Sequence, residues 1–301
     1  MTDPTGMYLM AIDGTGSEGW LRQGTANPNK LPNGRWLSHV MNFFEEYDGG
    51  KWFEHGPSDG TWASDMPEIE DIHMQKLAEY RAESPSNKDE PIDIIGWSRG
   101  AYAAMRLARR LKEEGVRDLD GTWTKNIPVR FLGLYDPVDM TFYDAPTWSE
   151  GRFSQSVISS NVQTATAIIG KKEGVFGSEV DYDNGSAPWY NWTRMDIQWN
   201  RQTKTKVEKL GATHGAIGGC PGYSPFWSVP VGYDYPHDRR MSILADRSMR
   251  SSAESVGVPI RVLSSIEYGF SSSSPTPSRA STIRSLLGSF VLHSGIGLGG
   301  F

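Results

Sequence analysis

Short apolar runs alternate with longer segments of helical periodicity along the first half of the chain. The runs that predict buried strands are 7–12, 91–95 and 127–135. The segments whose apolar residues recur at helical spacing are 36–47, 69–81 and 101–111. Strands that alternate with helices of this length form βαβ units, so the pattern predicts an α/β fold. We expect a mostly parallel central sheet with helices on both faces.

The second half is less regular and rich in aromatic residues. Within 140–205, tryptophans, tyrosines and phenylalanines are scattered among Gly, Asn, Asp and Ser. This composition predicts an insertion, which is either a loop-rich subdomain with its own small aromatic core or a cap that offers apolar walls to a ligand. The side chains that we select as candidate walls are Trp97, Tyr143, Trp148, Trp189 and Trp192.

Three further elements and a tail follow the insertion. The sequence predicts a short strand at 207–210, a helix at 240–256 and a strand at 259–266. A Ser/Pro-rich linker then leads into a short amphipathic segment at 283–291. We therefore expect one main domain at 1–270 and a linker with a C-terminal helix or tail at 271–301. That helix docks on the domain or, as the minor alternative, contacts a membrane surface.

A serine lies at the apex of the turn between a predicted strand and a predicted helix. Residues 96–100 are Gly-Trp-Ser-Arg-Gly, the Gly-x-Ser-x-Gly pattern of a nucleophile elbow, with Ser98 as the nucleophile. Gly96 and Gly100 flank the serine where a tight elbow leaves no room for a Cβ atom. The five-residue pattern alone also fits an ordinary Gly-rich turn, so its partners must decide between the two interpretations.

Candidate partners of Ser98 also follow predicted strands. Asp136 lies just past the strand at 127–135, and His214 lies in a Gly-rich loop after the last short strand. In parallel α/β sheets the chemistry is located at the carboxyl ends of the strands, and the order Ser, Asp, His is that of α/β-hydrolase triads. We therefore predict His214 as the general base and Asp136 as the acid that orients it. Asp139 is the alternative acid and His237 the competing base.

A Gly-rich loop, Asp13-Gly14-Thr15-Gly16, ends the first predicted strand. It lacks the Gly-Lys-Ser/Thr of a phosphate loop, so it is either a plain β-turn or a loop that presents backbone N–H groups beside the elbow. In the second case, the N–H of Gly14 or Thr15 joins that of Arg99 in stabilising an oxyanion.

Net charge and cysteine content limit the kinds of molecule that the protein is expected to bind. The chain has 301 residues and a net charge of -6, without an evident basic face, which argues against nucleic acid as a partner. Cys220 is the single cysteine, which excludes a disulfide framework and a thiolate metal cluster. No metal or cofactor is predicted. The first residues lack the basic start of a signal peptide, so we expect a protein that is cytoplasmic as synthesised, which is compatible with secretion that needs no cleaved signal.

Four segments resemble one family of α/β-hydrolases, a former domain of unknown function that includes phospholipase effectors of type VI secretion. They are 10–15 (Met-Ala-Ile-Asp-Gly-Thr), 96–101 (Gly-Trp-Ser-Arg-Gly-Ala), 131–138 (Phe-Leu-Gly-Leu-Tyr-Asp-Pro-Val) and 214–219 (His-Gly-Ala-Ile-Gly-Gly). Ala216 stands where the family has Asp, and Pro137 where it has Thr. The resemblance implies an α/β-hydrolase fold and, as an expectation, a lipid or phospholipid substrate.

The residues and the resemblance together predict a serine hydrolase that cleaves carboxylic esters through a Ser-His-Asp triad and an acyl-enzyme. Two alternatives remain open at this point. One is a non-catalytic hydrolase-like module that binds a ligand under the aromatic cap. The other is a peptidase or amidase that uses the same triad.

Overall fold

The computed structural model describes residues 7–15, 38–57, 65–118, 121–138, 157–170, 173–175, 178–180, 197, 199–221 and 235–263. All of them lie in the first of two compact units, Met1–Leu263. The second unit, Ser264–Phe301, contains the predicted linker and C-terminal helix and lies outside the described residues.

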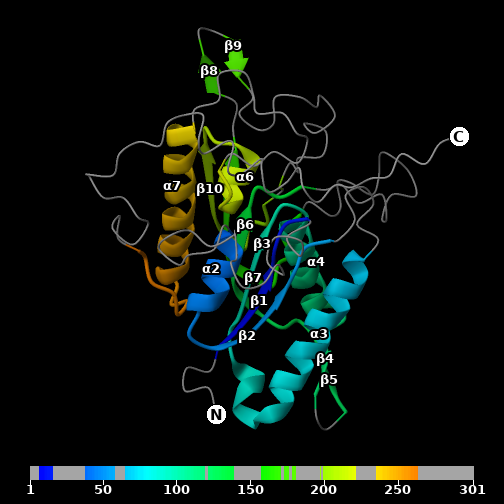
Figure 1. The fold of residues 1–301 in the computed structure, drawn as a ribbon. Coiled ribbons are helices and arrows are strands. Elements are labelled where there is room, and N and C mark those ends of the chain that lie inside the picture. Colours follow the sequence, from blue (N-terminus) through cyan, green and yellow to red (C-terminus); the bar gives the residue numbers. More distant parts are fainter. Residues whose placement is uncertain are drawn as a thin grey trace, which may run out of the picture. The chain divides into compact units, whose positions relative to one another are not determined.

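The centre of the first unit is a six-stranded parallel sheet in the order β10-β7-β6-β3-β1-β2 (Figure 1). Its strands are β1 (Tyr8–Ile12), β2 (Gly50–Glu54), β3 (Ile92–Trp97), β6 (Val129–Tyr135), β7 (Val162–Gly170) and β10 (Lys204–Leu210). The chain first adds β2 on one side of β1 and then adds β3 and the later strands on the other side. The winding therefore reverses between β1 and β3, and such a reversal opens a crevice at the carboxyl ends of the two strands.

Helices cover both faces of the sheet. On one face lie α3 (Met66–Glu83) and α4 (Arg99–Glu113), and on the other lie α2 (His39–Glu46), α6 (His214–Gly218) and α7 (Tyr235–Glu254). Successive strand residues point to opposite faces, so Met10 and Ile12 join the first core while Leu9 and Ala11 join the second. A strand that is buried on both faces has apolar residues on both, which explains why β1 is a continuous apolar run rather than an alternating one.

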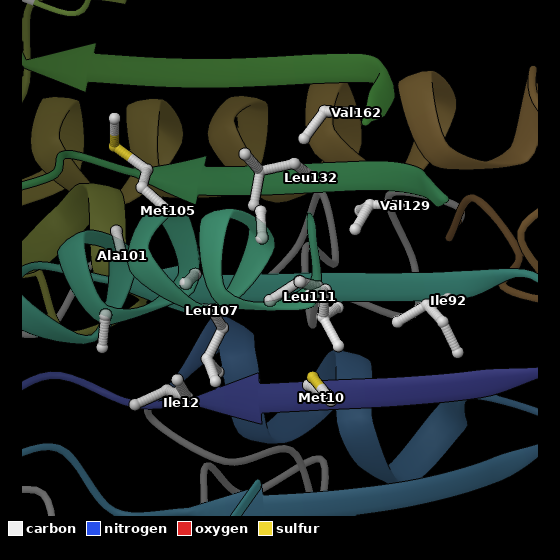
Figure 2. Packing of buried hydrophobic residues seen from close by; sticks show 14 of the residues in the cluster. Met10, Ile12, Ile92, Ala101, Met105, Leu107, Leu111, Val129, Leu132 and Val162 are labelled. Carbon is white, nitrogen blue, oxygen red and sulfur yellow. The ribbon is translucent and has the colours of Figure 1, made fainter. Parts of the chain in front are cut away.

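The core between α4 and the sheet is visible from close by in Figure 2. Leu107 and Leu111 of α4 lie with Met10 of β1, Ile92 of β3 and Leu132 of β6 in one cluster of buried side chains. Each of the five is 0% exposed. This packing fixes the angle at which α4 leaves the carboxyl end of β3.

Small elements complete the described part of the chain. A 3-10 helix, η1 (Pro85–Asp89), precedes β3. The strands β4 (Val116–Arg117) and β5 (Trp123–Thr124) form one antiparallel pair, and β8 (Glu173–Val175) and β9 (Ser178–Val180) form another.

A buried ion pair holds the amino-terminal end of β3. The Asp93 carboxylate accepts hydrogen bonds from the Arg130 guanidinium and, at 2.9 Å, from the Tyr47 hydroxyl. Asp93 is buried and lies at the opposite end of β3 from Ser98. The pair therefore joins β3, β6 and the end of α2 without approaching the loops at the carboxyl edge.

The structure corrects three sequence predictions. The range 140–205 is not a continuous insertion, because β7 is a full strand of the central sheet between β6 and β10. Its run of Thr, Ala and Ile has the β-branched composition of a buried strand, which the surrounding aromatic and polar residues obscured. No strand was predicted between the helical segments 36–47 and 69–81, yet the edge strand β2 lies there, and residues 259–263 of the last predicted strand are not a strand.

Sheet order, strand direction and helix placement together give an α/β-hydrolase-like fold, as the sequence predicted. The helices at 39–46, 66–83, 99–113 and 235–254 overlap the predicted ones, and their ends differ by a few residues. None of the described helices is long and apolar enough to cross a bilayer.

The core in Figure 2 supports a first prediction. Leu132 is 0% exposed, so Leu132→Ala removes apolar contacts and leaves a cavity, and we expect it to lower the free energy of unfolding by about 2–5 kcal/mol. Leu244→Ala is the matched control because Leu244 of α7 is 43% exposed, and it should change stability by less than about 0.5 kcal/mol. Urea denaturation of both variants measures the difference. Equal effects would contradict the assignment of Leu132 to the core.

Candidate active site

The elbow between β3 and α4 holds its serine in a strained conformation. Ser98 has φ 58 and ψ -126, a backbone region that residues with a side chain rarely adopt. Its N–H donates to the Tyr135 carbonyl at 2.9 Å, and its carbonyl accepts from the Val138 N–H at 3.1 Å. These two bonds join the elbow to the end of β6. Strain of this kind at the tip of a strand–turn–helix unit is the signature of a nucleophile elbow.

Two glycines make the elbow sterically allowed. A Cβ atom on Gly100 would lie 2.2 Å from the Asp13 carbonyl oxygen, and one on Gly96 would lie 2.4 Å from the Gly100 carbonyl oxygen. Both distances are far inside van der Waals contact, and both involve backbone atoms that no side-chain rotation can move. The first turn of α4 therefore packs directly on the end of β1.

The predicted acid and base form a buried pair. The His214 Nδ1–H donates to Asp136 Oδ2 at 2.8 Å, and both residues are buried. The other carboxylate oxygen, Oδ1, accepts from the Gly170 N–H at 3.2 Å, and the Asp136 N–H donates to the Ile168 carbonyl at 2.8 Å. The end of β7 thus holds the aspartate from two sides. A carboxylate that receives Nδ1–H fixes the imidazole tautomer in which Nε2 accepts a proton.

His214 begins α6, a single short turn whose N-cap is Thr213. The helix ends at Gly218, and its C-cap residue Gly219 has φ 107. The competing base, His237, lies on α7, and its Nε2–H donates to the Gly211 carbonyl at 2.8 Å, in the loop just before α6. His237 is therefore bonded to the chain that leads to His214, while Asp136 is paired with His214 itself.

The Asp-Gly-Thr loop is joined to the elbow through side chains. The Arg99 Nε–H donates to Thr15 Oγ1 at 2.6 Å, so the second residue of the elbow is tied to the loop after β1. The Gly14 N–H donates to Asp13 Oδ1 at 2.8 Å. Because that N–H already has an acceptor, the geometry favours Thr15 over Gly14 as the second oxyanion donor. The other predicted donor, the Arg99 N–H, belongs to the first residue of α4.

The Trp97 side chain packs between the Asp-Gly-Thr loop and α6. Its indole is 2% exposed, and its ring lies 5.4 Å from the His214 ring, between centroids. Cβ atoms built on Gly14 and Gly218 would lie 2.5 and 2.0 Å from indole carbons, so neither the Asp-Gly-Thr loop nor α6 could carry a side chain at these positions. The indole thus fills the space between the Asp-Gly-Thr loop and α6.

The structure brings the predicted Ser98, Asp136 and His214 to the carboxyl ends of β3, β6 and β10, with Gly14, Thr15 and Arg99 beside them. The predicted wall residues other than Trp97 lie outside the described residues, as does Asp139. The four wall residues outside the described part of the chain are Tyr143, Trp148, Trp189 and Trp192.

Sequence reasoning missed the residues that hold the pair in place. Gly170 went unnoticed because β7 itself was not predicted. Among the described residues no cluster of His, Cys, Asp or Glu has the arrangement of a metal site.

The chain matches no family model and no curated protein. Among solved structures, an uncharacterized protein from Pseudomonas aeruginosa is 15% identical over 88% of this chain and 48% of its own, with a TM-score of 0.45. This chain thus spans about half the length of that protein. A type II thioesterase from the borrelidin biosynthetic cluster is 13% identical over 86% of this chain and 94% of its own, with a TM-score of 0.37. An acetyl xylan esterase is 12% identical over 84% and 99%, with a TM-score of 0.33. Likenesses this distant carry no argument about activity, so the function is argued from the site.

The strain at Ser98 leads to a prediction about stability. Glycine accepts φ 58 and ψ -126, whereas alanine keeps the Cβ atom and therefore the strain. Relief of about 1–3 kcal/mol of strain, less about 0.5–1 kcal/mol for the greater freedom of an unfolded glycine, leaves Ser98→Gly more stable than Ser98→Ala by about 1 kcal/mol. Thermal and urea unfolding of the two variants measure this difference. An alanine variant as stable as the glycine variant would contradict the strained elbow.

Asp13 leads to a prediction about pH. Burial raises the pKa of this carboxyl from 3.8 to about 6, although the Ser38 hydroxyl and the Gly14 N–H oppose the shift. Because the folded state holds the proton more tightly than the unfolded state, this group's contribution to stability is complete below about pH 4 and is lost as pH rises through about 6. The loss is about 3 kcal/mol at most.

Asp13→Asn keeps an oxygen that accepts the Gly14 N–H but cannot ionise. The unfolding free energy of the wild type should therefore fall relative to that of Asp13→Asn between about pH 4 and pH 7. Urea titrations across this range measure the difference, with Asp89→Asn at an exposed position of η1 as the control. A difference that is constant with pH for Asp13→Asn would show that the buried carboxyl does not titrate in this window.

Proposed function

We propose that this protein is a serine hydrolase that cleaves carboxylic esters. The observation that carries the proposal is the buried pair of His214 and Asp136, 2.8 Å apart, beside a serine in a strained elbow. A purely structural role for His214 would not require a buried carboxylate at its Nδ1. An ordinary turn would not require a serine at φ 58. The two features together are those that make a serine hydroxyl a nucleophile.

In the proposed mechanism, Ser98 Oγ attacks the acyl carbon while His214 Nε2 accepts its proton. Asp136 remains ionised and stabilises the imidazolium that forms. The N–H groups of Arg99 and Thr15 donate hydrogen bonds to the carbonyl oxygen as it becomes negatively charged. Each such donor lowers the barrier by about 3 kcal/mol. His214 then returns the proton to the leaving alcohol, which departs and leaves an acyl-enzyme. A water molecule hydrolyses that ester by the same steps.

The narrower proposal is that the ester belongs to a lipid or phospholipid, as in type VI secretion effectors. Its support is the resemblance of the Asp-Gly-Thr and Gly-x-Ser-Arg-Gly-Ala segments, which the structure shows to be neighbours joined by Arg99 and Thr15. The mechanism itself does not select a lipid, since the triad attacks any activated acyl group. Substrate choice therefore has to be measured.

The test combines a labelling reagent with a substrate panel. A fluorophosphonate should modify wild-type protein at Ser98, located by mass spectrometry of the labelled peptide, and should leave Ser98→Ala unmodified. Ser86→Ala, at an exposed serine of η1, should label like the wild type. Asp136→Asn should lower kcat about 10⁴-fold, because the imidazole then loses its tautomer and its counter-charge.

The panel contains short and long p-nitrophenyl esters, thioesters, phospholipid vesicles and peptide amides. Hydrolysis of esters that is lost in Ser98→Ala supports the proposal, and a preference for vesicles supports the narrower one. Cleavage of amides alone would assign the triad to an amidase. A folded wild-type protein that takes no label and cleaves nothing would instead favour a ligand-binding module on a hydrolase fold.

A further inference from the structure

We infer that Asp238 and Thr213 form a clamp that positions the imidazole of His214. The inference rests on the proposed function, in which His214 is the base, and adds two positioning residues on α7 and at the N-cap of α6. Their hydrogen bonds to each other and to the first turn of α6 place them next to His214 in the chain, so we treat both as positioning residues that act through His214.

The clamp consists of two hydrogen bonds to one carboxylate. The Thr213 N–H donates to Asp238 Oδ1 at 2.8 Å, and the Thr213 hydroxyl donates to Asp238 Oδ2 at 2.7 Å. Asp238 is 0% exposed. Burial of a carboxylate is costly unless its oxygens accept hydrogen bonds, and here each oxygen accepts one from the same residue, the one before His214.

The same threonine also begins the helix that carries His214. Thr213 Oγ1 accepts from the Ala216 N–H at 3.1 Å, which is the N-cap bond of α6. Once its proton is committed to Asp238, the hydroxyl presents its lone pairs to that amide. The carboxylate on α7 therefore orients the cap, and the cap orients the first residue of the helix.

A short helix depends on such a clamp more than a long one does. α6 spans only His214–Gly218, so little of its geometry comes from internal hydrogen bonds. The His214 ring and the Gly218 backbone pack against Trp97, and the loop 211–213 leads into the start of the helix. His237 bonds Gly211 in that loop at 2.8 Å, so adjacent residues of α7 hold both ends of the segment that enters α6.

The first experiment compares two substitutions at Thr213. Thr213→Val keeps the shape but loses the hydroxyl, and with it the bonds to Asp238 Oδ2 and to the Ala216 N–H. Thr213→Ser keeps both. A small displacement of a catalytic base costs on the order of 100-fold in rate. We therefore expect kcat on the best ester of the panel to fall about 100-fold in Thr213→Val, with KM within about twofold, and to recover in Thr213→Ser to within about threefold of the wild type.

Asp238→Asn tests the other half of the clamp, because the amide keeps one acceptor and loses the charge. It should lower kcat in the same direction as Thr213→Val. The matched control is Asp93→Asn, which removes another buried carboxylate, at the far end of β3 and bonded to Arg130 and Tyr47. Asp93→Asn should lower the melting temperature without a comparable loss of kcat per folded molecule. Equal kcat in wild type, Thr213→Val and Asp238→Asn would overturn the clamp.

A second readout does not depend on activity. In protein with ¹⁵N-labelled histidine, the proton on His214 Nδ1 should give a downfield NMR signal, because its bond to Asp136 slows exchange with water. Its absence in His214→Gln assigns it. We expect the signal in the wild type and in Thr213→Ser, and its loss in Thr213→Val.

The two readouts separate two kinds of failure. If wild-type protein shows no hydrolysis, the proposed function fails, and the clamp is then judged by the Nδ1 proton alone. If the wild type is active but the proton persists and kcat is unchanged in Thr213→Val, the clamp fails and the proposed function stands.

Discussion

The contact between the first turn of α4 and the carbonyl of Asp13 sets the geometry of the whole site. Because a Cβ on Gly100 would lie 2.2 Å from that oxygen, the helix can approach β1 only at a glycine. The approach places Ser98 at the reversal point of the sheet, between the loops that leave β1 and β6. Arg99 then reaches Thr15, and the indole of Trp97 reaches α6. Both of these contacts depend on the close approach of Gly100 to Asp13.

The three proposed triad residues differ in how firmly the fold supports them. Ser98 and Asp136 extend directly from buried central strands, so their backbone positions are fixed by the sheet. His214 comes from a five-residue helix that follows an edge strand and has no such support of its own. Contacts from α7 and from Trp97 supply it instead. A base that must transfer protons needs a firm orientation more than any other member of a triad, because proton transfer is sensitive to small displacements.

Much of this arrangement could be predicted from the chain alone, and the reasons are local. The strands before Asp13, Ser98 and Asp136 are largely apolar runs, and Gly-rich turns follow the first two, so the ends of the strands and the candidate catalytic residues coincide in the sequence. β7 was not predicted because its Thr and Ala residues are weakly apolar, although Ala165, Thr166 and Ala167 are buried in the sheet. Without β7, the hydrogen bond between the Gly170 N–H and Asp136 could not be predicted. Asp238 lies in the polar stretch Tyr-Pro-His-Asp at 235–238, and only the fold shows that it is buried.

The bonds around the proposed base also have a consequence for the order in which a new chain matures. Asp136 meets His214 across 78 positions, Thr213 meets Asp238 across 25, and His39 of α2 bonds Ser242 of α7 across 203. During synthesis the elbow and the acid leave the ribosome long before the helix that steadies the base. Closure of such distant contacts is slow because chain entropy opposes it. A nascent chain that ends before α7 therefore holds all three proposed triad residues but lacks the contacts that α7 makes with the segment before His214. In the proposed enzyme, the orientation of the base would thus be completed after the nucleophile and the acid are in place.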